Sequence, residues 1–147
     1  MIGVYAPALV PTIAEVLAQL GARRAYVVHG ADGIDELSPS GPNLVCEVVD
    51  GVVRKRTIDP AELGIERCAA GELSGGSPEE NAASIRAVFA GERGGKRDAV
   101  LLNAAGAIAA SGHADDLREG LELARAALDS GAAAERLDEL AEFSRAA

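Results

Sequence analysis

Two adjacent carboxylates, Asp35 and Glu36, are the side chains of this sequence best suited to chemistry. They end the run HGADGIDE at residues 29–36, which directly follows the apolar segment 25–28. Magnesium prefers oxygen ligands, and proteins commonly hold it with one or two carboxylates plus phosphates of a substrate. An apolar strand that leads into glycines and acids is typical of a cation site at a strand's carboxyl end in an α/β protein. The run by itself predicts a magnesium site for a phosphate-bearing ligand, although a solvated acidic turn would show the same pattern.

The other polar residues of the run have less to offer. His29, at the end of the expected strand, could be an acid–base catalyst, but nothing in the pattern places a nucleophile beside it. A hydrogen-bonded structural histidine is therefore the favoured interpretation. Asp32 is expected to shape the loop rather than bind metal, and Gly30 and Gly33 are expected to give its backbone freedom.

A second glycine-rich segment, residues 71–78, precedes an expected helix and could hold a phosphate at the helix N-terminus. Glu79 and Glu80 would repel an anion there, and a capping box between Ser77 and Glu80 explains the same residues without a ligand. We therefore reject this segment as the main phosphate site. Asn81 and Asn103, on expected helices, are predicted to tie neighbouring segments together by hydrogen bonds.

The elements that must position the acidic pair can be predicted from apolar spacing and turn residues. Residues 2–5 suit the end of a strand, and a helix with Pro7 or Pro11 in its first turn carries apolar residues at helical spacing as far as Gly21. Residues 25–29 follow as a buried strand, so the chain opens with a strand–helix–strand crossover and a parallel pair. Asp50-Gly51 then predicts a two-residue turn between antiparallel strands at 44–49 and 52–58.

The rest of the chain is predicted to be helical. We expect a short helical turn at 60–63 closed by Gly64, then helices at 78–90, 98–111, 115–129 and 133–145. A strand at 100–102 is the alternative for the second of these helices, but the alanine-rich continuation favours a helix that ends at Gly112. The predicted fold class is α/β, with a partial parallel sheet and crossover helix, one antiparallel hairpin and a helical C-terminal half.

Composition bounds the class of protein. The 147 residues suit one domain with a real hydrophobic core, 48% of them hydrophobic and only 3% aromatic. A formal net charge of −9 disfavours nonspecific binding to nucleic acid or acidic membranes. Cys46 and Cys68 have no metal-ligand spacing and are interpreted as reduced thiols. Without a membrane-length apolar run or the shape of a signal peptide, the expected location is the cytoplasm.

Four segments in order resemble the C-terminal portion of the anthranilate phosphoribosyltransferase family. They are HGADGIDELSP with the hairpin around Asp50-Gly51, GELSGGSPEENA, RDAVLLNAAGAIAASG, and LDSGAAAERLDEL. The resemblance covers nearly the whole chain. It implies a glycosyltransferase of tryptophan biosynthesis that joins anthranilate to the ribose C1 of phosphoribosyl pyrophosphate and releases pyrophosphate. It also implies that Asp35 and Glu36 bind Mg²⁺, and that the amine of anthranilate attacks, so that no protein nucleophile is needed.

The departures from that family are as informative as the matches. Its glycine-rich pyrophosphate loop GTGGD and its anthranilate-binding segment KHGN are absent, and Asn43 stands where threonine is expected. We therefore expect residues 1–147 to form a single truncated α/β domain that lacks the family's N-terminal helical domain and first strand, and to be inactive alone. The substrate-binding residues are then unknown, and no catalytic residue is assigned.

Two further hypotheses remain open. The chain could be a noncatalytic fragment that forms homo-oligomers or dimers, or that pairs with a complementary N-terminal half, since an unpaired sheet edge favours self-association. It could also belong to a related enzyme such as a pyrimidine nucleoside phosphorylase, although the HGADGIDE run favours the anthranilate enzyme.

Overall fold

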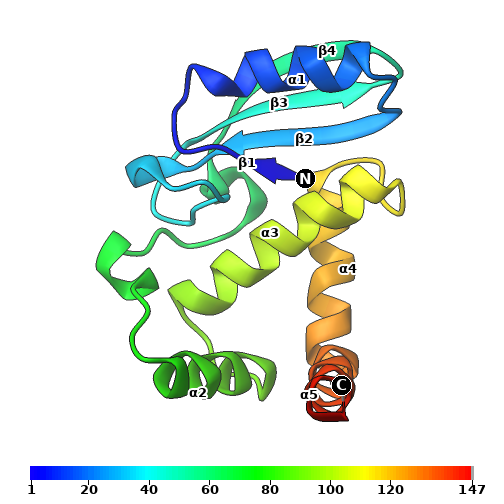
Figure 1. Cartoon of the computed structure of the whole chain (residues 1–147). Coiled ribbons are helices and arrows are strands. Elements are labelled where there is room, and N and C mark those ends of the chain that lie inside the picture. The colour runs from blue at the N-terminus through cyan, green and yellow to red at the C-terminus, as the bar shows by residue number, and fades with distance from the viewer. Residues whose placement is uncertain (147) are drawn as a thin grey trace.

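A computed structural model describes residues 1–146 (Figure 1). A four-stranded sheet occupies one end of the molecule, with α1 on its outer face and α3 and α4 running away from the other. The α-helices and β-strands are β1 (Ile2–Gly3), α1 (Leu9–Gln19), β2 (Arg24–His29), β3 (Asn43–Val49), β4 (Val52–Ile58), α2 (Pro78–Phe89), α3 (Gly95–Ser111), α4 (Leu117–Asp129) and α5 (Ala132–Ala146). Short 3-10 helices lie at Ala31–Gly33, Pro60–Leu63 and Ala70–Leu73. The predicted α/β class is confirmed.

The sheet has the strand order β1-β2-β3-β4. The parallel pair predicted from the crossover is β1 and β2, with Ile2 opposite Val27, and the predicted hairpin is β3 and β4. Its turn places Asp50 at φ 48° and Gly51 at φ 80°, the left-handed conformations that a two-residue hairpin turn requires. β3 also pairs antiparallel with β2 along its length, so the segment between these two strands connects direct neighbours.

Alternation along β2 divides the core into two clusters. Ala25 and Val27 pack with α1 on one face of the sheet, whereas Tyr26 and Val28 pack on the other with α3 and α4. All four side chains are buried, as expected of a strand covered on both faces. The acidic segment therefore begins at the end of a strand that is packed on both faces.

The α3 helix lies diagonally beneath the sheet and packs closely against α4 (Figure 1). A Cβ on Gly120 of α4 would lie 2.6 Å from the Ala105 carbonyl oxygen, so the glycine permits this close approach. Arg24 of β2 donates from Nη1 to the carbonyls of Ala109 (3.3 Å) and Ala114 (2.8 Å). A cation near the C-terminus of a helix also interacts favourably with its dipole, so Arg24 links the sheet to α3.

The structure corrects two helix starts. α3 begins at Gly95 rather than Asp98, because Gly94 at φ 126° turns the chain and its carbonyl accepts from the Asp98 N–H at 3.1 Å. The alternative strand at 100–102 is wrong, since these residues lie inside α3. α4 begins at Leu117 because the Asp116 side chain caps it. Within residues 1–146 no helix is both long and apolar enough to cross a membrane.

Candidate metal site at the end of strand β2

The acidic pair lies in the connection between β2 and β3, residues 30–42, which we call the acidic loop. Its backbone packs directly against two glycines. A Cβ on Gly3 would lie 1.4 Å from the Asp35 carbonyl oxygen, and a Cβ on Gly30 would lie 2.1 Å from that of Glu36. The N–H of Gly30 also donates to the Ile34 carbonyl at 2.8 Å. The ends of β1 and β2 thus hold the backbone that carries both carboxylates.

Only part of the expected glycine role is confirmed. Gly33 has φ 81° and needs the freedom of glycine, but Gly30 has φ −81°, which any residue adopts. Gly30 is required for close approach instead, so the prediction of backbone freedom at this position was wrong. Asp32, at φ 62°, accepts a hydrogen bond from the Ser40 hydroxyl, which joins the two ends of the loop as predicted for a loop-shaping residue.

Asn43 holds the far end of the acidic loop and is 1% exposed. Its Oδ1 accepts from the Ser38 N–H at 2.7 Å, and its Nδ2 donates to the carbonyls of Ser38 and Gly41, each at 3.0 Å. A buried amide with its hydrogen bonds satisfied fixes a unique local geometry. The sequence suggested that asparagine in place of threonine is a minor difference. In the structure, however, the Asn43 side chain holds the acidic loop.

Asp35 and Glu36 both line one cavity of about 480 Å³ between the acidic loop, the segment 70–75, and α2 and α3. Both side chains are exposed, and Lys96 is the single basic residue among those that line the cavity within residues 1–146. Lys96 Nζ donates to the Ser84 hydroxyl at 3.0 Å, and the rest of the wall is largely apolar, with Ile34 and Val88 among its residues. Two acidic residues and one lysine thus line a common space that is open to solvent.

This donor set fits one way of binding magnesium. Within residues 1–146 no three or more His, Cys, Asp or Glu side chains gather as ligands for one ion. Magnesium usually keeps several waters and binds through one or two carboxylates plus substrate phosphates. Asp35 and Glu36 match that open arrangement in number and type, and Lys96 lines the same cavity.

The remaining candidates have structural roles. His29 Nδ1 lies 2.8 Å from the Val4 carbonyl oxygen, so this nitrogen donates the hydrogen bond, and the favoured interpretation holds. In the capping box at α2, Ser77 Oγ accepts from the Glu80 N–H at 3.2 Å and Glu80 Oε2 accepts from the Ser77 N–H at 2.7 Å. The Ser77 N–H lowers the pKa of Glu80, which keeps its charge and disfavours an anion there.

Asn81 and Asn103 do tie segments together, as predicted. Asn81 clamps Gly76 at the start of α2, and Asn103 clamps Leu37 in the acidic loop. Lys96 was missed by the sequence reasoning. Its only signal was a position two residues after Gly94, which carries no indication that the side chain shares a cavity with the acidic pair.

The sheet, the covering helices and the acidic loop together form an α/β architecture. Residues 1–134 match the model of the glycosyl transferase family, a/b domain, and the chain belongs to this family. Its relatives there are named anthranilate phosphoribosyltransferases. The enzyme of Thermomicrobium roseum is 52% identical over 149 residues, which cover 99% of this chain and 43% of the relative. That of Pelotomaculum thermopropionicum is 49% identical over 143 residues, 97% of this chain and 41% of the relative.

Solved structures with a similar fold are also named anthranilate phosphoribosyltransferases. The anthranilate phosphoribosyltransferase of Thermus thermophilus superimposes with a TM-score of 0.87 at 42% identity, covering 97% of this chain and 42% of that one. The Saccharomyces cerevisiae enzyme in complex with PRPP and Mg gives 0.79 at 26% identity, covering 92% of this chain and 38% of that one. The chain thus spans about two fifths of the length of the relatives it matches.

Proposed function

We propose that this chain is the metal-binding α/β part of an anthranilate phosphoribosyltransferase that acts in tryptophan biosynthesis. The single observation that carries the proposal is that Asp35 and Glu36 follow strand β2 and line one cavity with Lys96. A relative at 26% identity is described in complex with PRPP and Mg, which supports the same ligands here. Residues 1–147 would form a single domain of the enzyme.

In the proposed reaction, the amine nitrogen of anthranilate forms a bond to ribose C1 as the bond from C1 to the pyrophosphate oxygen breaks. The leaving pyrophosphate keeps that electron pair, and the nitrogen then loses a proton. A bound Mg²⁺ would neutralise charge that develops on the pyrophosphate. Asp35 and Glu36 would hold the ion, and Lys96 would attract the phosphates. A cytoplasmic location belongs to the same proposal, because the free thiols of Cys46 and Cys68 suit a reducing compartment.

Metal binding can be tested directly with Mn²⁺ as a paramagnetic probe for Mg²⁺. In NMR spectra of the chain, Mn²⁺ should broaden amide signals around Asp35 and Glu36 first, and excess Mg²⁺ should reverse the effect. The double variant Asp35→Asn, Glu36→Gln should lose the local broadening at the same Mn²⁺ concentration. Equal broadening in the double variant, at the same place, would refute the assignment of these two residues.

Activity requires a second test. We predict negligible phosphoribosyl transfer by the chain alone, because the GTGGD and KHGN segments of the resembling family are absent from it. Mixing it with the complementary N-terminal part of the Thermomicrobium roseum enzyme should produce transfer, detected by the fluorescence change when anthranilate is consumed. Turnover by the purified chain alone would contradict the first expectation.

A noncatalytic fragment that self-associates is the second candidate, and two exposed apolar regions favour it. β1 is a short edge strand with Ile2 41% exposed, and on α5 Leu140 and Phe143 are 63% and 74% exposed. Open strand edges and apolar surface promote association. We expect dimers or larger species by light scattering, and a stable monomer at high concentration would count against this candidate.

A further inference from the structure

Neither carboxylate of the acidic pair is oriented by its own contacts. Within residues 1–146 no hydrogen bond or ion pair restrains the side chain of Asp35 or Glu36. Their positions therefore depend on the backbone that carries them. Gly3 and Gly30 support this backbone from the sheet, so the question is what holds it from the helical side.

Asn103, in the middle of α3, supplies that support. Its Oδ1 accepts from the Leu37 N–H at 2.9 Å, and its Nδ2 donates to the Leu37 carbonyl at 2.8 Å and to the Ala99 carbonyl at 2.9 Å. The amide thus binds both backbone groups of the residue after Glu36 and is anchored to its own helix by a third bond. The Leu37 side chain is 1% exposed and packs in the core with Leu102.

The consequence is a rigid attachment directly beside the acidic pair. Carbonyl contacts to Gly3 and Gly30 fix Asp35 and Glu36 on one side, and the clamp on Leu37 fixes the chain on the other. Groups that orient metal ligands affect metal affinity strongly although they do not touch the ion. A helix residue is suited to this role because its own backbone does not move with the loop.

We propose that Asn103 is a positioning residue that aligns Asp35 and Glu36 for a divalent cation. This proposal rests on the function proposed above, in which the acidic pair binds magnesium. Removing the amide would free the backbone at Leu37. Both acidic side chains would still be present, but they would no longer be held in one alignment. The change would therefore appear in the affinity for the cation rather than in the identity of its ligands.

The test compares the Mn²⁺ affinity of folded variants by paramagnetic NMR broadening. Asn103→Ala should bind Mn²⁺ about 10-fold to 100-fold more weakly than the parent, the range for residues that orient ligands. Asn103→Gln keeps the amide on α3 but displaces it by one methylene, and should fall between the two. Asp116→Ala is the control. The Asp116 side chain caps α4 by accepting hydrogen bonds from the N–H groups of Arg118 and Glu119, each at 2.9 Å. Asp116→Ala therefore lowers the stability of the protein through a change that is far from the acidic loop in sequence.

The outcomes separate the two proposals. If Asp35→Asn, Glu36→Gln leaves the local broadening unchanged, the metal site itself is wrong. If that double variant loses binding but both Asn103 variants bind Mn²⁺ like the parent while folded, only the positioning role is overturned. Equal weakening in Asp116→Ala and Asn103→Ala would also overturn it, because a general loss of stability would then explain both. Should Asn103→Ala fail to fold, the decision passes to Asn103→Gln.

Discussion

Gly3→Ala tests whether the acidic loop is held by close backbone contact with the sheet. The new Cβ would start 1.4 Å from the Asp35 carbonyl oxygen and needs at least 3.0 Å, so the carbonyl must retreat by about 1.6 Å. The obstacle is backbone rather than the end of a flexible side chain, so the strain cannot be relieved by a rotamer change. Overpacking typically costs up to about 3 kcal/mol, and this substitution belongs at that end of the range.

The assay is thermal unfolding followed by circular dichroism, paired with Mn²⁺ broadening of the folded variant. A loss of about 3 kcal/mol corresponds to a fall in Tm of roughly 6 to 12 °C for a chain of this size. Broadening around Asp35 should weaken as well, because the displaced carbonyl belongs to that residue. The two readouts together distinguish a moved loop from a simple loss of stability.

Gly71→Ala is the matched control, since a Cβ there meets nothing within 4 Å and the backbone has no positive φ. It should change the free energy of unfolding by less than about 0.5 kcal/mol. If Gly3→Ala unfolds at the same temperature as Gly71→Ala, the contact between β1 and the acidic loop is not as close as described, and the reasoning is refuted.

Three other substitutions test the packing around the site. Arg24→Met should lower the free energy of unfolding by about 2 kcal/mol in urea denaturation, because it removes charged hydrogen bonds to two carbonyls at and beyond the end of α3; a neutral result would contradict the link between sheet and helix. Leu121 is 1% exposed in the core between α3 and α4, so Leu121→Ala should lower the free energy of unfolding by about 2 to 5 kcal/mol in the same experiment. A smaller loss would mean that the core collapses to fill the space left by the side chain. Burial, with Glu47 beside the hydroxyl, raises the pKa of Tyr26 from 10.0 to about 12. Stability should therefore fall as pH rises from 10 towards 12, since the unfolded state loses this proton first, and Tyr26→Phe should flatten that slope.

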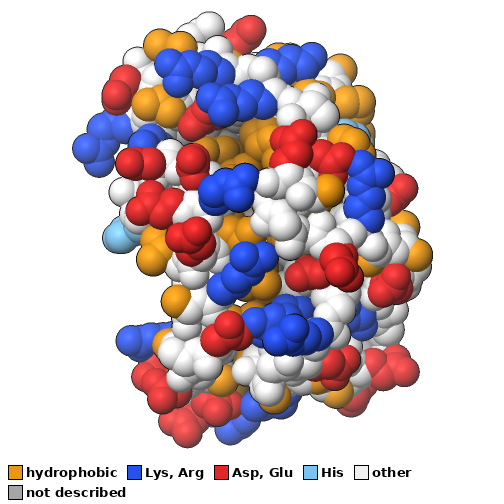
Figure 2. Space-filling model, turned by 180° about the vertical axis from the view of Figure 1, so that it is seen from behind, with side chains coloured by type: hydrophobic (Ala, Val, Ile, Leu, Met, Phe, Trp, Pro, Cys, Tyr) orange, Lys and Arg blue, Asp and Glu red, His pale blue; other side chains and the backbone are white. Residues whose placement is uncertain are grey.

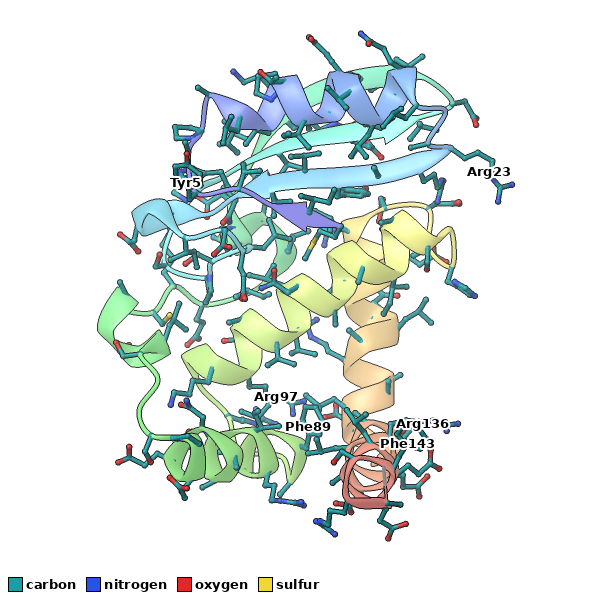
Figure 3. All side chains as sticks on the ribbon, in the orientation of Figure 1. Tyr5, Arg23, Phe89, Arg97, Arg136 and Phe143 are labelled. Atoms are coloured by element: carbon teal, nitrogen blue, oxygen red, sulfur yellow. The ribbon has the colours of Figure 1, made fainter. Side chains whose placement is uncertain are left out.

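Surface charge gives little guidance to the site. Figure 2 shows acidic and basic side chains interspersed over the back of the molecule, with apolar side chains visible between them. The basic run 54–56 lies exposed on β4, and Arg56 pairs with Glu47 at 3.5 Å. Arg97 lies between α2 and the end of α4, where it pairs with Asp129 (Figure 3). These contacts are structural.

Local signals were sufficient for most elements of the fold. The Asp50-Gly51 turn, the Ser77–Glu80 capping box and the glycine after α3 each act within a few residues, so their consequences could be predicted without a fold. The start of α3 was placed too late because its first turn, Gly95 to Arg97, is not marked by a capping side chain. The backbone at Gly94 decides it instead.

The sequence by itself determined the α/β class, the strand that leads to Asp35 and Glu36, and the resemblance that points to a phosphoribosyltransferase. All of these depend on the order and spacing of neighbouring residues. Only the tertiary structure decided that backbone carbonyls pack closely against Gly3 and Gly30. It also decided that Asn103 binds Leu37, which lies 66 positions away in the chain. It also brought Lys96 to the cavity of the acidic pair. Contacts between distant segments arise from how β1, β2 and α3 pack, and no local pattern encodes which side chains that packing brings together.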